Sequence, residues 1–64
     1  MKTFLDGAQI RRLMRRHGVT IRGLAATMNI TLRRIRHVRR HGVTGSHYVM
    51  DWMEGIAGDP YAEA

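Results

Sequence analysis

The sequence predicts an all-α fold, a compact domain of four or five helices. Three observations support this. The chain has 64 residues, too few for more than one domain. Four stretches repeat apolar residues at the i, i+3, i+4, i+7 spacing of a helix that buries one face. Each stretch is also bounded by residues that typically begin or end helices. We expect residues 1–58 to form the domain and residues 59–64 to form a flexible tail.

The first predicted helix follows Asp6, a suitable N-cap with Gln9 as its capping-box partner. Gly18 is expected to end it in the left-handed conformation. His17 is either at the helix end or in the core. The apolar face comprises Ile10, Leu13, Met14 and His17, and the basic face comprises Arg11, Arg12, Arg15 and Arg16.

Two further helices follow in close succession. Thr20 is expected to cap the second, and Asn29 to end it, because Asn tolerates the left-handed conformation. Thr31 is expected to cap the third, and Gly42 to close it. The apolar residues are Ile21, Leu24, Ala25 and Met28 in the second helix and Leu32, Ile35 and Val38 in the third.

A fourth helix is expected from about Ser46 to Ala57, where Gly58-Asp59-Pro60 stops it. Its large apolar residues exceed what one narrow face of a short helix usually buries. Two interpretations therefore stay open, and they do not exclude each other: Trp52 completes the core, and some of these residues form a dimer seam. The candidates for that seam are Val49, Met50, Trp52, Met53 and Ile56.

One six-residue sequence occurs twice, at residues 15–20 and 39–44. Its Arg and His residues favour the negative end of a helix dipole. Its Gly suits the left-handed position, its Val packs back, and its Thr can cap a following helix. We therefore predict one way of stopping a helix, used twice.

Charge is divided unevenly along the chain, which has a net charge of +6. All ten arginines lie between Arg11 and Arg40, and no acidic residue lies between Asp6 and Asp51. Such a basic body attracts polyanions and releases their counterions. Arginine, unlike lysine, also makes bidentate contacts with phosphate and guanine. A solvated charged face is the alternative explanation.

Several classes of function are disfavoured. The absence of cysteine excludes disulfides and thiolate metal sites. His37 and His41 are spaced to share a metal, but nothing supplies further ligands, so we expect no metal or cofactor. Catalytic triads, phosphate-binding glycine loops and paired carboxylates are not evident, so we expect neither an enzyme nor a small-molecule substrate. With no apolar run long enough for a bilayer and no signal peptide, we expect a cytoplasmic, nucleoid-associated protein.

The second and third helices are separated only by Asn29-Ile30-Thr31. Two short helices so joined cross steeply, in the helix-turn-helix arrangement, here about residues 20–40. Ala25 provides the small side chain where the helices approach. Ile30, Ile35 and Val38 would pin the third helix to the core.

Residues 20–35 resemble the helix-turn-helix of lambda-repressor and Cro-like (XRE-type) regulators, and the flanking helices extend the resemblance to about residues 7–57. Three departures exist: the family often has Gln where Ile21 stands and Gly where Asn29 stands, and Gly23 is unusual in this helix. The resemblance implies a lambda-repressor-like domain that binds operators as a dimer. The matching positions are Ala25, Asn29, Ile30, Thr31, Ile35 and Val38.

The resemblance also implies that the third helix enters the major groove. Arg33 and Arg36 are the expected guanine contacts, with His37 beside them. Leu32 would either touch a thymine methyl or pack against the core. Contact of the first-helix arginines with DNA stays open. The expected phosphate contacts are Arg22, Thr31, Arg34, Arg39 and Arg40.

We therefore expect a sequence-specific double-stranded DNA-binding repressor or autoregulator that acts as a homodimer on an inverted repeat. Its small size suggests a phage or mobile-element origin, by analogy. One alternative is an architectural or recombination accessory protein of the excisionase-like kind. Another is a module that binds an acidic protein through its basic face.

Overall fold

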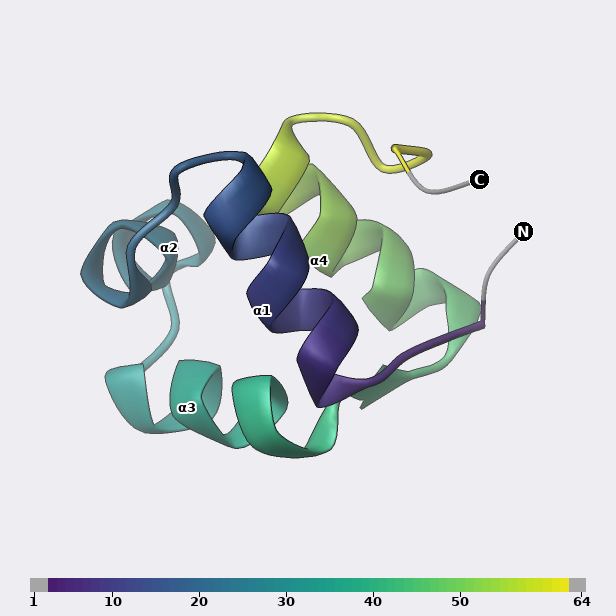
Figure 1. Ribbon diagram of the computed structural model, residues 1–64, viewed down its shortest axis with the longest axis horizontal. Helices are drawn as coiled ribbons and strands as arrows, with labels where there is room; N and C mark the ends of the chain where they lie inside the picture. The colour runs from purple at the N-terminus through teal and green to yellow at the C-terminus, as the bar shows by residue number, and fades with distance from the viewer. Residues whose placement is uncertain (1–2, 63–64) are drawn as a thin grey trace.

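The computed structural model describes residues 3–62, which form a mostly helical domain with four helices and two short strands (Figure 1). All four predicted helices are present. The predicted all-α fold is confirmed in its four helices, but two short strands are also present, and residues 3–62 contain no fifth helix. In chain order, the elements are β1 (Phe4–Leu5), α1 (Gly7–Arg16), α2 (Ile21–Met28), α3 (Leu32–His41), β2 (Val43–Thr44) and α4 (Ser46–Ala57).

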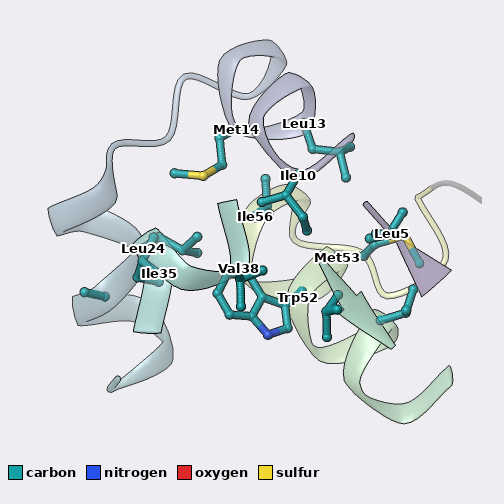
Figure 2. Packing of buried hydrophobic residues seen from close by; sticks show 13 residues of the cluster. Leu5, Ile10, Leu13, Met14, Leu24, Ile35, Val38, Trp52, Met53 and Ile56 are labelled. Atoms are coloured by element: carbon teal, nitrogen blue, oxygen red, sulfur yellow. The ribbon is translucent and has the colours of Figure 1, made fainter. Parts of the chain in front are cut away.

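The core lies between the four helices and the two strands. In Figure 1, α1 crosses the middle of the view, with α3 along the bottom and α2 at the left. Side chains from every element converge on the interior, as Figure 2 shows for most of them. The buried residues are Leu5, Ile10, Leu13, Met14, Leu24, Ala25, Ile35, Val38, Val43, Val49, Trp52, Met53 and Ile56.

Side-chain caps begin three of the helices, as the sequence predicts. A carboxylate oxygen of Asp6 accepts from the Gln9 N–H at 2.8 Å, and the Gln9 amide oxygen accepts from the Asp6 N–H at 2.8 Å. The Thr20 hydroxyl accepts from the Gly23 N–H at 2.9 Å, and the Thr31 hydroxyl accepts from the Arg34 N–H at 3.1 Å. The first turns of α1, α2 and α3 are therefore fixed locally.

The ends of α1 and α2 share one geometry. After α1, Gly18 is left-handed (φ +63°), and the Val19 N–H donates to the Met14 carbonyl at 2.9 Å. After α2, Asn29 is left-handed (φ +56°), and the Ile30 N–H donates to the Ala25 carbonyl at 3.0 Å. This bond, from the residue after the left-handed one back to the last turn, defines the Schellman motif. The prediction that Asn29 turns the chain is confirmed.

Asn29 gives a first testable prediction. Replacement by Ala should reduce the free energy of unfolding by about 1 kcal/mol, because a Cβ without a local hydrogen-bonding group disfavours positive φ. Asn29→Gly should leave stability within about 0.5 kcal/mol of the parent. Urea denaturation at an unchanged slope measures both. Equal stability of the Ala and Gly variants would show that the left-handed conformation at position 29 does not affect the free energy of unfolding.

The second copy of the repeated sequence ends α3 differently, so the prediction of one helix stop used twice is wrong. Gly42 has φ +83° and ψ −170°, and the chain continues as β2, antiparallel to β1, with Val43 opposite Leu5. Thr44 does not cap α4, whose N-cap is Gly45, without a side-chain cap. A Cβ on Gly42 would lie 2.3 Å from the Leu5 carbonyl oxygen. Pairing with a distant strand therefore decides this conformation.

The two strands also explain why α4 buries more of its apolar residues than one narrow face would. Both strands contact α4, in addition to α1 and α2. The side chains of Val49, Trp52, Met53 and Ile56 are 0–4% exposed, while Met50 is half-buried. The core interpretation of Trp52 is confirmed. Of the five candidates for a dimer seam, Met50 is half-buried and the other four are buried in the single chain, and the seam itself stays a prediction.

The first residues of the expected flexible tail form a hydrogen-bonded turn after α4. The Tyr61 N–H donates to an Asp59 carboxylate oxygen at 3.0 Å, and the Ala62 N–H donates to the Asp59 carbonyl at 3.1 Å. The rest of the expected tail, residues 63–64, lies outside the described residues. Over residues 3–62, we find no helix with the length and apolar character needed to cross a membrane.

Candidate nucleic-acid interface

The outer face of α3 gathers the residues that the sequence singled out for base contact. Ile35 and Val38 are buried, which turns the opposite side of the helix toward solvent. Four exposed residues on that side surround one shallow hollow; we call them the reading face, and they are Arg33, Arg36, His37 and Arg40. The structure therefore brings together three of the four predicted base contacts and one predicted phosphate contact.

Two of the predicted contacts flank the reading face at the start of α3. Thr31 and Arg34 are exposed and share a second hollow with Arg33 and His37. Leu32 is half-buried and packs against the core, in agreement with the packing alternative. The first turn of α3 therefore offers polar and cationic groups to a ligand, with Leu32 anchoring it from behind.

The turn between α2 and α3 holds this face outward. Ala25 is 9% exposed and provides the small residue expected where the helices approach. Asn29 reverses the chain in the left-handed conformation, and Ile30 packs against the core. Thr31 then fixes the start of α3 through its cap. A rigid turn of this kind sets the angle at which α3 is presented.

Arg11 differs from the other arginines of α1 because it bonds to the helix that carries the reading face. Its guanidinium donates to the carbonyl oxygen of Arg39, in the last turn of α3. Arg11 thereby ties α1 to the end of the helix that carries the reading face. No sequence signal reveals this bond, because its acceptor is a backbone carbonyl distant along the chain.

The helices around the reading face are basic, although Arg34 at its flank shares a hollow with two acidic residues of α4. No Asp or Glu occurs between Gly7 and His41, the span of α1, α2 and α3. Arg22, in the first turn of α2, is exposed. The exposed acidic residues Asp51 and Glu54 belong to α4 instead. The positive potential is therefore concentrated on the helices that surround the reading face.

The ring of His37, in the reading face, lies against the ring of His41 in a tilted arrangement. The rings of His37 and His41 have centroids 4.6 Å apart and are tilted by 42°. Within residues 3–62, no group of three or more His, Cys, Asp or Glu side chains is placed to hold a metal ion. The pair therefore adds two hydrogen-bonding rings to the basic surface.

Comparison of the chain with protein-family models, curated proteins and solved structures finds no match. The resemblance to lambda-repressor and Cro-like regulators therefore stays a prediction from the sequence.

Proposed function

We propose that this chain is a sequence-specific double-stranded DNA-binding protein of the lambda-repressor-like helix-turn-helix type, acting as a transcriptional repressor or autoregulator. The observation that carries the proposal is the reading face: a row of guanidinium and imidazole groups on a helix whose other side is locked into the core. The major groove, about 12 Å wide, admits one such α-helix.

The contacts divide into two kinds under this proposal. Arg33 and Arg36 donate to O6 and N7 of guanine, and His37 reads a neighbouring base. The second set meets phosphates, which position the helix without specifying sequence. That second set comprises Arg22, Thr31, Arg34, Arg39 and Arg40.

A homodimer on an inverted repeat completes the proposal. One short helix reaches few base pairs, so a two-fold pair of α3 helices on successive turns of DNA doubles the sequence that is read. Because most of the large apolar residues of α4 are buried, the contact between copies lies on other surface residues. Two exposed large apolar residues are candidates for this contact: Phe4 in β1, 48% exposed, and Tyr48 in the first turn of α4, 56% exposed.

Selection of bound sites from random duplexes with the purified chain tests the proposal. We expect an inverted repeat with half-sites about one helical turn apart. Enrichment of no sequence, together with DNA bending in a gel assay, would favour the architectural alternative. For phosphate contacts, log K should fall by about 0.9 per neutralised phosphate for each tenfold rise in salt concentration. Binding to duplex DNA without such a salt dependence would contradict the DNA proposal and favour an acidic protein partner.

A further inference from the structure

A groove with an apolar floor lies between α4 and the segment that joins α2 to α3. Its volume is ≈ 650 Å³. Met28 and Ile30 are half-buried and pack against the core, and Trp52 lines the groove together with them. We call it the α4 groove and define it by Met28, Ile30, Arg34, Asp51, Trp52 and Glu54.

Close packing of α2 against α4 sets the shape of this groove. Gly55, in α4, approaches Met28 so closely that a Cβ would lie 2.8 Å from the Met28 Cγ and 2.9 Å from its Sδ. The thioether of Met28 therefore lies directly over α4. Because this apolar wall is only half-buried in the single chain, a partner that covers it removes further apolar surface from water, which favours association.

The carboxylates of the α4 groove leave charge for a partner to neutralise. Asp51 and Glu54 are exposed on one wall, and Arg34 lies on the other. Within residues 3–62, Glu54 has no ion-pair partner, and Asp51 Oδ2 meets only the exposed His47 Nε2, at 3.6 Å. An arginine from outside suits both parts of the groove, since its apolar stem covers the floor while its guanidinium reaches a carboxylate.

The complementary surface occurs on the solvent side of α1. Arg12 and Arg15 are exposed and lie on one face of the helix, at i and i+3. Within the part of the chain that the structure describes, neither guanidinium has a hydrogen-bond or ion-pair partner. The phosphate contacts of the proposed function use neither residue. We call Arg12 and Arg15 the basic stripe.

The groove and the basic stripe are separate surfaces. The groove lies beside the start of α3, where Arg34 lines it, and it has no lining residue from α1. α1 instead begins beside the end of α3, where Gly7 and Arg11 contact its last turn (Figure 1). One copy of the chain can therefore use both surfaces at once, each with a different neighbour.

We infer that the α4 groove of one copy binds the basic stripe of a second copy, with Arg12 and Arg15 facing Asp51 and Glu54. The contact joins two different surfaces, so it is head-to-tail and can repeat along a row of copies. It is distinct from the two-fold contact of the proposed homodimer, which pairs one surface with itself.

The net charge of +6 on each copy opposes this contact at longer range. We therefore expect weak association in the free protein, and stronger association where DNA phosphates neutralise the arginines of α2 and α3. Only the strengthening by DNA rests on the proposed function. Copies bound side by side on a duplex would then hold one another in place.

NMR spectra of the full chain over a range of concentrations, without DNA, test the contact. Between about 0.02 and 1 mM, we expect saturable shifts of amide signals in α1 and α4. The groove variant (Asp51→Asn with Glu54→Gln) and the stripe variant (Arg12→Gln with Arg15→Gln) should each weaken association about fivefold, as expected for two surface ion pairs. Absence of shifts up to about 1 mM would overturn the inference.

A charge-matched control separates the basic stripe from the net charge. Arg33→Gln with Arg36→Gln removes the same charge from the exposed side of α3 and should not weaken association. The stripe variant carries less positive charge than the parent, so weaker association in it cannot come from repulsion between copies. Equal weakening by the control would contradict a contact through α1.

A mixture of the two variants distinguishes a head-to-tail contact from a two-fold one. The isotope-labelled groove variant keeps its basic stripe, and the unlabelled stripe variant keeps its groove. Mixing them should restore the shifts in α1 of the labelled chain but not in its α4. It would also show that both variants are folded. If each variant alone loses association and the mixture does not regain it, the groove pairs with itself and the head-to-tail contact is wrong.

Binding to a long duplex of random sequence tests the strengthening by DNA. The parent should bind cooperatively, and the groove variant should bind with a less steep isotherm. A parent isotherm without cooperativity would overturn the strengthening. Failure of the chain to bind any duplex would remove the proposed function and leave the NMR result intact, so the two can fail separately.

Discussion

Replacing Gly42 with Ala should lower the free energy of unfolding by about 3 kcal/mol or more. The backbone at Gly42 (φ +83°, ψ −170°) lies in a region that is essentially restricted to Gly, which alone penalises Ala by about 1–3 kcal/mol. The new Cβ would also lie 2.3 Å from the Leu5 carbonyl oxygen and 2.8 Å from the Asp6 Cα, both backbone atoms. Since a chain of this size is stable by roughly 3–10 kcal/mol, the variant should be largely unfolded or close to it.

The repeated sequence contains its own control. Gly18 occupies the same place in the first copy, is left-handed (φ +63°), and has nothing within 4 Å of an added Cβ. Gly18→Ala should therefore reduce stability by only about 1 kcal/mol. Urea denaturation of the two variants, side by side, gives the comparison. Equal losses would mean that the contact between Gly42 and β1 does not hold the fold together.

Arg33→Ala should reduce affinity for the selected DNA site by about 1–3 kcal/mol, or roughly 5- to 150-fold, and should relax the preference at one base position. Arg33 lines two hollows at the outer face of α3, whereas Arg36 also lines a hollow between α3 and α1. Arg33 is therefore the cleaner test of base contact. Titrations against the selected duplex and a random duplex, at one salt concentration, measure the effect.

Arg40→Ala is the companion variant, because it makes the same change of charge on the same helix. It should weaken binding to both duplexes by similar factors, as expected for a phosphate contact. If Arg33→Ala also affected both duplexes equally, α3 would hold DNA without distinguishing its sequence.

Local interactions account for the part of the fold that the sequence predicts. The caps Asp6, Thr20 and Thr31 act within their own first turns, and Asn29 acts within its own turn. Such interactions are encoded by neighbouring residues, which is why the starts of α1, α2 and α3 are predictable. The start of α4 has no side-chain cap, and its apolar spacing indicates it instead. The strands β1 and β2 have two residues each, too few to show a periodic pattern, and they exist through pairing across the chain.

The same distinction between local and long-range interactions applies to the candidate site. Helical spacing explains why Arg33, Arg36, His37 and Arg40 share an exposed face, since they stand at i, i+3, i+4 and i+7. The hollow that Arg36 and Arg39 share with Arg11 was not predictable, because it depends on how α1 packs against α3 and on the close approach of Gly7. The burial of Trp52 was also undecided, since a core stripe and a dimer seam have the same apolar spacing in a sequence.

The anchoring of α3 at both ends has a thermodynamic consequence for the proposed function. The turn at Asn29 fixes its start, and the contacts of Gly42 with Leu5 and of Arg11 with Arg39 fix its end. A helix already ordered in the free protein loses little backbone entropy on association. Binding calorimetry should therefore show only the small heat-capacity change of docking two formed surfaces, without the large one that accompanies coupled folding.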